Sequence, residues 1–228
     1  MVKRREAIPE ESAHSQEANT VIPPPTKLHV TAWTLPTSKA MHRIHQDIYQ
    51  GDQFNPGVKG NARFSPITDA KGAAIPTLYA AYTFDAALMF HDVSHAPGYK
   101  HYDKNKLNQQ VHSTVKVSQN LVLADLSSVA LRKLGVQRKQ LIDTEKDQYP
   151  NTREWAQAIH RQHPDIQGLS WVSRQDDSAR AVMLFGDRIP AGTLQQIGAS
   201  RNLLQDEKAY AELLDLAERI GADVVPGK

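Results

Sequence analysis

The chain has 228 residues, of which 40% are hydrophobic and 23% are charged, and its formal net charge at pH 7 is +2. This composition is ordinary for a globular protein and provides for one substantial core. The chain has no cysteine, which excludes disulfides and thiolate metal sites and fits a reducing cytoplasm, the location we expect. No apolar run is long enough to span a membrane, and no clustered basic face indicates direct nucleic-acid binding.

The first residues differ in character from the rest of the chain. Residues 1–27 are polar and end in the run Pro23–Pro25. Such a composition favours a flexible tail, so we expect the folded domain to occupy residues 28–228. In the first half of this domain, apolar clusters and alternation predict strands separated by turn-rich loops. They are expected at Leu28–Trp33, near Ile44, at Arg63–Ser65, Leu78–Tyr82, Val111–Val117 and Leu121–Leu126, with one helix over Phe84–His91.

The second half is predicted to begin with two helices. Ser127 or Ser128 can cap a short helix that ends at Gly135, and Thr152 is expected to cap a second that continues through Ile159. A hairpin then follows, with strands at Gly168–Ser173 and Ala181–Phe185, and an amphipathic helix lies within Leu203–Ile220. Strands and helices mixed without regular alternation indicate the α+β class, in one domain with a helical C-terminal extension.

Four side chains are candidates for ligand binding. Arg43 and Arg63 each lie on or beside a predicted strand, and a planar guanidinium matches paired phosphate oxygens; the alternative is an ordinary surface or salt-bridged arginine. The ring of Tyr79 can stack on a flat heterocycle, although a strand tyrosine is commonly part of the core. Ser173, at a strand end, can orient a ligand through its hydroxyl or serve only in a turn.

Other familiar sites are not supported by the sequence. His91 and His95 have the spacing of two zinc ligands on one helix face, but the glutamate of the metalloprotease motif and a third ligand are missing, so no metal is expected. There is also no Gly-x-Gly-x-x-Gly motif and no Walker loop, so neither a Rossmann site nor a P-loop is predicted.

Taken in order, several short motifs resemble the RES domain family, NAD⁺-consuming enzymes often found as toxins beside small antitoxins. The match runs from about Leu35 to Arg188 and includes His42–His45, Phe54–Pro56, Gly60–Pro66, Leu78–Ala81, Ala86–Leu88, Tyr149–Ala156 and Gly168–Arg174. The resemblance implies an α+β fold related to ADP-ribosyltransferases, with a mixed sheet and flanking helices. It implies cleavage of the bond between nicotinamide and ribose in NAD⁺, by hydrolysis or phosphorolysis.

The resemblance also assigns roles to the four side chains. Arg43 and Arg63 would hold the phosphates, Tyr79 would line the nicotinamide pocket, and Ser173 would be the family serine. NAD⁺ would be the substrate, so no separate cofactor is expected. A cognate antitoxin or immunity protein is the partner that the family implies.

One family residue is missing from its expected place. Relatives carry a glutamate directly after an Ala-Leu-x stretch, whereas here Ala87-Leu88-Met89 is followed by Phe90. Either three residues have been deleted, which would rotate the rest of the helix by about 60°, or Phe90 replaces the glutamate. Asp85 or Asp92 is a candidate substitute. Because a lost electrostatic stabiliser costs about 10² to 10³ in rate, we expect weak or absent turnover with dinucleotide binding retained.

Two alternatives to an NAD⁺-degrading enzyme stay open at this point. One is an inactive relative that binds a nucleotide or a protein, and the other, with less support, is an ADP-ribosyltransferase that modifies a macromolecule. The segment Gln110–His112 and the helix within Leu203–Ile220 could either support self-association or pack in the core of the domain.

Overall fold

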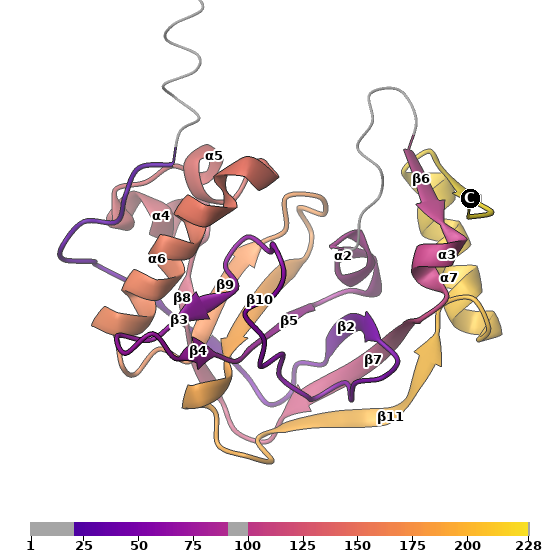
Figure 1. Ribbon diagram of the computed structural model, residues 1–228, viewed down its shortest axis with the longest axis horizontal. Helices are drawn as coiled ribbons and strands as arrows, with labels where there is room; N and C mark the ends of the chain where they lie inside the picture. The colour runs from indigo at the N-terminus through magenta and orange to yellow at the C-terminus, as the bar shows by residue number, and fades with distance from the viewer. Residues whose placement is uncertain (1–20, 91–99, 228) are drawn as a thin grey trace, which may run out of the picture.

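A computed structural model of the protein describes residues 21–90 and 100–227. A large mixed sheet forms its centre, with the strand order β1-β8-β9-β10-β5-β2-β7-β11 (Figure 1). Its strands are β1 (Ala32–Leu35), β2 (Met41–Gln46), β5 (Thr77–Ala81), β7 (Gln110–Val117), β8 (Leu121–Asp125), β9 (Gly168–Val172), β10 (Arg180–Phe185) and β11 (Leu194–Asn202). β8 and β9 are parallel, whereas the other neighbouring strands are antiparallel. A mixed sheet with flanking helices confirms the predicted α+β class.

The helices gather at two ends of this sheet (Figure 1). One group is α4 (Ser128–Leu134), α5 (Arg138–Leu141) and α6 (Tyr149–Gln162), and the other is α2 (Phe84–Met89), α3 (Lys104–Leu107) and α7 (Glu207–Arg219). Two short 3₁₀ turns, η1 (Lys146–Gln148) and η2 (Gly186–Arg188), and two small ribbons complete the described part of the chain. The ribbons are β3 (Ile67–Thr68) with β4 (Ala74–Ile75), and β6 (Lys100–Asp103) with β12 (Ala222–Val225).

Three apolar clusters hold these layers together. Trp155 and Ile159 of α6 pack with Phe185 of β10 on one face of the sheet, and Val115, Leu123 and Leu184 belong to a cluster on the other. The third cluster lies between α2 and α7 and contains Leu88, Leu213 and Leu216. The apolar face of α7 is therefore buried in the core of this chain, as one of the two readings of its amphipathic sequence predicts.

Some element ends differ from the prediction. Ser127 is the N-cap residue of α4, and Gly135 ends that helix with a φ of 77°, both as expected. Thr152, however, does not cap α6, which begins three residues earlier at Tyr149 with Pro150 in its first turn. Proline is well tolerated there because backbone N–H groups in the first turn of a helix have no intrahelical acceptor, so the missing N–H of proline removes no hydrogen bond. The Thr152 hydroxyl donates instead to the carbonyls of Arg63 and Tyr149.

Two predicted strands near the N-terminus also need correction. β1 begins at Ala32 rather than Leu28. Arg63 and Phe64 lie in a tight turn rather than a strand, and this turn is closed by the hydrogen bond from Ala62 N to Ser65 O at 3.1 Å. From this turn the Arg63 side chain reaches Thr144 and Tyr149.

The chain is packed before residue 28, within the predicted tail. Val21 is buried, and Trp155 Nε1 donates to the carbonyl of Ile22 at 2.7 Å. The ordered contacts therefore reach back at least to Val21, while the domain boundary itself stays a prediction. None of the helices in the described residues is long and apolar enough to cross a membrane.

Candidate functional site

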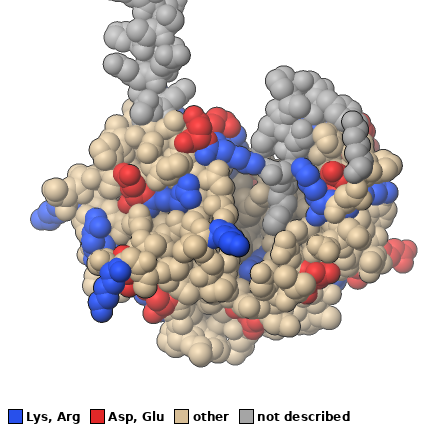
Figure 2. All heavy atoms as spheres, in the orientation of Figure 1, with Lys and Arg blue, Asp and Glu red and all other residues tan. Residues whose placement is uncertain are grey.

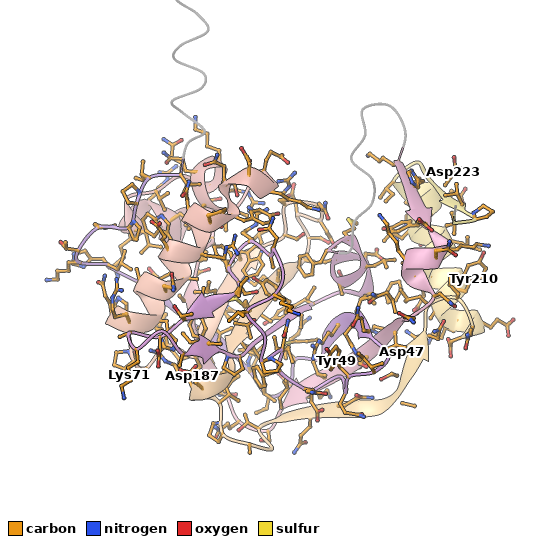
Figure 3. The ribbon with its side chains drawn as sticks, in the orientation of Figure 1. Asp47, Tyr49, Lys71, Asp187, Tyr210 and Asp223 are labelled. Atoms are coloured by element: carbon orange, nitrogen blue, oxygen red, sulfur yellow. The ribbon has the colours of Figure 1, made fainter. Side chains whose placement is uncertain are left out.

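A cavity of about 1060 Å³ opens beside β2, β5 and the end of α2. Figure 2 shows a hollow in this face between the part that carries α6 and the part that carries α2, with basic side chains near its rim. In Figure 3, Asp47 and Tyr49 mark the loop after β2, and Tyr49 is one of the lining residues. Arg43, Arg63, Tyr79 and Ser173 all line this one cavity, although they come from four separate segments. Its volume is at the upper end of the range for small-molecule sites.

Arg43 lies in β2 as predicted, and its guanidinium holds the following loop. Nη1 donates to the carbonyls of Gly51 at 2.8 Å and Gln53 at 2.6 Å. The same loop also packs tightly against Ser113 of β7. Residue 51 must be small there, because a Cβ at Gly51 would be 2.5 Å from Cβ of Ser113. Burial lowers the pKa of Arg43 to about 10, against the opposing effect of Asp52. The group therefore stays cationic at neutral pH.

Arg63 is fixed by the segment before α6. Nη1 donates to Oγ1 and, at 3.3 Å, to the carbonyl oxygen of Thr144, and Nη2 lies 3.4 Å from the hydroxyl of Tyr149. The guanidinium also lies over the Tyr149 ring, 4.9 Å from its centroid. Across residues 21–90 and 100–227, no carboxylate forms a salt bridge with Arg43 or Arg63. Two largely buried cations that face a cavity without such partners favour an anionic ligand.

Tyr79 forms part of the aromatic wall, with its ring 6.2 Å from that of Trp171. Its hydroxyl accepts the N–H of Phe64 at 3.0 Å and so ties β5 to the turn that carries Arg63. Burial raises the pKa of Tyr79 to about 12, although hydrogen bonds from Ser65 and Phe64 act in the other direction. The phenol therefore remains protonated, with one hydrogen available to donate.

Ser173 follows the last residue of β9 and is buried. Its Oγ accepts the N–H of Gln175 at 3.2 Å, which is the turn contact that a purely structural serine would make. It also lines the cavity. The two roles predicted for Ser173 are thus compatible in this geometry.

In residues 21–90 and 100–227, the carboxylates that could act in the cavity are engaged in ion pairs. Asp85, one predicted substitute for the family glutamate, is not a lining residue and pairs with Arg219 at 2.7 Å, so that expectation is wrong. Asp92, the other, lies outside the described residues, as does the His91–His95 pair. Glu145 is the one carboxylate among the described lining residues, and it pairs with Arg174 at 3.1 Å while its side chain is 72% exposed.

Phe90 ends α2 and lines the cavity in the position directly after Ala87-Leu88-Met89. Its ring is 6.5 Å from that of Trp171. Thr83 starts this helix by accepting the N–H of Ala86 at 3.1 Å, and the buried Phe84 and Leu88 anchor it. The side chain that the end of α2 contributes to the cavity is therefore the apolar ring of Phe90.

Several contributors were not singled out from the sequence. Trp171, Tyr149 and Arg174 occur inside the quoted motifs, but their contacts with the four predicted side chains depend on the tertiary structure. Thr144, which accepts hydrogen bonds from Arg63 and Arg174, is in no motif at all. In the described part of the chain, no group of three or more His, Cys, Asp or Glu residues is arranged to hold a metal ion.

Comparisons with known proteins show the fold and the family of this chain. The described fold is similar to a chain in the crystal structure of the M. tuberculosis MbcT–MbcA toxin–antitoxin complex, with a TM-score of 0.56 and 15% identity over 79% of this chain and 91% of that chain. No curated protein matches the sequence. The family model of the RES domain matches residues 40–206, a range that includes the four predicted side chains and well over half of the sequence. The chain therefore belongs to the RES domain family.

Proposed function

We propose that this protein is an NAD⁺-degrading enzyme of the RES toxin type, which binds NAD⁺ in the cavity and breaks its nicotinamide–ribose bond slowly. The observation that carries this proposal is the convergence of Arg43, Arg63, Tyr79 and Ser173 on one cavity. Two guanidiniums that pair with no carboxylate of the described residues suit the pyrophosphate. The wall of Tyr79 and Trp171 suits the flat nicotinamide ring.

In the proposed reaction, the bond between ribose C1′ and the nicotinamide nitrogen breaks, and its electron pair goes to the nitrogen. Nicotinamide is already cationic, so it leaves as a neutral molecule and the ribose gains oxocarbenium character. Attack of water at C1′ gives ADP-ribose and a proton, and attack of phosphate gives the 1″-phosphate of ADP-ribose. Arg43 and Arg63 contribute by positioning the pyrophosphate, which places C1′ against the aromatic wall.

A carboxylate near the ribose would stabilise this positive charge, and such preorganised electrostatics are usually the largest catalytic contribution. Here the chain supplies Phe90 at the end of α2, while Glu145 is largely exposed and engaged with Arg174. We therefore expect turnover about 10² to 10³ lower than in a homologue with the glutamate. The same observation favours a second candidate function, in which the cavity binds the dinucleotide without cleaving it.

A protein partner is part of the proposal. The structurally similar chain belongs to a toxin–antitoxin complex, and on that analogy we propose a cognate antitoxin for this chain. Ile48, 73% exposed, and Val58, 61% exposed, provide apolar surface on the loop beside the cavity, which is the kind of surface that such a partner would cover.

Binding and turnover are tested separately. In a thermal-unfolding assay, NAD⁺ at 100 times its Kd stabilises a binding-competent fold by about 2.7 kcal/mol. We expect this stabilisation in the wild type and its loss in R63Q, with R219Q as the control because Arg219 lies on α7 and pairs with Asp85 and Asp215. Chromatography of released nicotinamide then measures turnover. Absence of any NAD⁺-dependent stabilisation would refute the proposal, whereas stabilisation without release identifies the second candidate.

A further inference from the structure

Arg174, the residue after Ser173, meets Arg63 at a single backbone oxygen. Nη1 of Arg174 donates to the carbonyl of Thr144 at 2.7 Å, and Nη1 of Arg63 donates to the same oxygen at 3.3 Å. Both side chains line the cavity. The two guanidiniums are therefore near neighbours on one wall, although they are 111 positions apart in the sequence.

Among the described residues, this wall carries more positive than negative charge. Glu145 forms a salt bridge with Arg174, but in the residues that the structure describes no carboxylate pairs with Arg63. Two like charges in a partly desolvated wall disfavour each other, and the charge of Arg174 adds to burial in lowering the pKa of Arg63. A second negative charge at this wall would relieve the repulsion.

The carboxylate that does pair with Arg174 is easily displaced. The Glu145 side chain is 72% exposed, whereas that of Arg174 is 27% exposed, and an exposed ion pair of this kind contributes little to stability. The Arg174 guanidinium is also held independently of Glu145 by the Thr144 carbonyl. An incoming phosphate can therefore take the place of the carboxylate without loss of the geometry.

We propose that Arg174 is a third phosphate-binding guanidinium of the cavity, beside Arg43 and Arg63, paired with Glu145 when the cavity is empty and with a phosphate group of the ligand when it is filled. This inference rests on the proposed function, because it concerns the phosphates of the dinucleotide. The same chemistry would accept free inorganic phosphate, the co-substrate of phosphorolysis. Arg63 and Arg174 then form a two-arginine fork, which binds phosphate oxygens with more specificity than either group alone.

The test compares three variants by calorimetric titration with NAD⁺ and, separately, with inorganic phosphate. R174Q removes the proposed contact, E145Q removes its competitor, and R180Q is the matched control. Arg180 forms a salt bridge with Asp125 at 3.1 Å and has a side chain that is 25% exposed, close to the values for Arg174, but it does not line the cavity. We expect R174Q to bind NAD⁺ about tenfold more weakly, R180Q to bind like the wild type, and E145Q to bind more tightly.

The opposite signs of two variants separate ligand binding from support of the fold. If Arg174 served only to hold the loop through Glu145, both R174Q and E145Q would weaken binding, and the inference would be overturned. Binding by R174Q should also depend less on added salt than binding by the wild type, because one charge contact is gone, and R174K should recover part of the affinity. Thermal unfolding confirms that each variant is folded.

Titration with the two ligands shows whether the phosphate group comes from NAD⁺ or from free phosphate. It also separates failure of this inference from failure of the proposed function. If R174Q loses affinity for both NAD⁺ and inorganic phosphate, the fork is a general phosphate site, and loss for NAD⁺ alone assigns it to the dinucleotide. If the wild type binds NAD⁺ and R174Q matches R180Q, this inference fails while the proposed function stands. If the wild type binds neither NAD⁺ nor phosphate, both fail.

Discussion

Replacing Phe90 by glutamate should return a carboxylate to the cavity and increase nicotinamide release from NAD⁺. Phe90 is the residue at which α2 ends, it lines the cavity, and it is 38% exposed. A glutamate at this position would keep its carboxylate in contact with water, and its side chain is smaller than the ring that it replaces. Arg63 and Arg174 line the same cavity, and among the described residues only Glu145 pairs with either of them, so their positive charge favours the ionised form.

The substitution is expected to change both the rate of nicotinamide release and the stability of the fold. A carboxylate aimed at the developing ribosyl cation increases the rate by about 10² to 10³, which corresponds to roughly 2.7–4 kcal/mol. Loss of the aromatic contact with Trp171, 6.5 Å away between ring centroids, costs about 0.5–1.5 kcal/mol of stability. A negative charge at the end of a helix costs about 0.3–1 kcal/mol more. The variant should therefore be somewhat less stable than the wild type but more active.

The assay is nicotinamide release by chromatography at saturating NAD⁺, with F90Q as the control because glutamine has the shape of glutamate without its charge. We expect F90E to exceed the wild type by at least tenfold and F90Q to match the wild type. If F90E binds NAD⁺, remains folded and releases nicotinamide no faster than F90Q, then the missing carboxylate is not what limits turnover. The alignment with three deleted residues, the glutamate among them, would then be preferred, since Phe90 does not occupy the place of the glutamate in that alignment.

Two further predictions concern the support of the site and of the fold. T144V removes the hydroxyl that accepts from Arg63 while it keeps the volume of the side chain; because a hydrogen bond to a charged group contributes about 1.5–3 kcal/mol, NAD⁺ titration should show a Kd at least tenfold higher, whereas T144S should match the wild type. His112 accepts from Arg201 through Nδ1 at 2.8 Å, and burial lowers its pKa to about 3. The unfolded chain takes up this proton near pH 6.5 but the folded chain does not, so stability should fall by about 2 kcal/mol between pH 7 and pH 5. Chemical denaturation at both pH values should show the decrease, and H112Q should reduce it; an unchanged pH dependence in H112Q would assign the decrease to other groups.

Local pattern was sufficient to predict most elements near the site. Alternating apolar residues predicted β7, and helix-favouring residues after Thr83 predicted α2, because these signals depend on neighbours in the chain. The turn at Arg63 and the early start of α6 were not predicted. Both depend on distant partners: the Thr152 hydroxyl donates to the carbonyl of Arg63, 89 positions away.

The sequence alone determined the family, the candidate side chains and the position of Phe90 directly after Ala87-Leu88-Met89, since each is a matter of residue type and order. Only the tertiary structure decided which of these groups share a cavity and which charges are already paired. Asp85 and Glu145 illustrate the reason, because one is taken up by Arg219 of α7 and the other reaches Arg174 across the cavity wall. Charged groups pair with the groups that lie near them in space. This proximity results from long-range packing of strands and helices, which local sequence patterns do not encode.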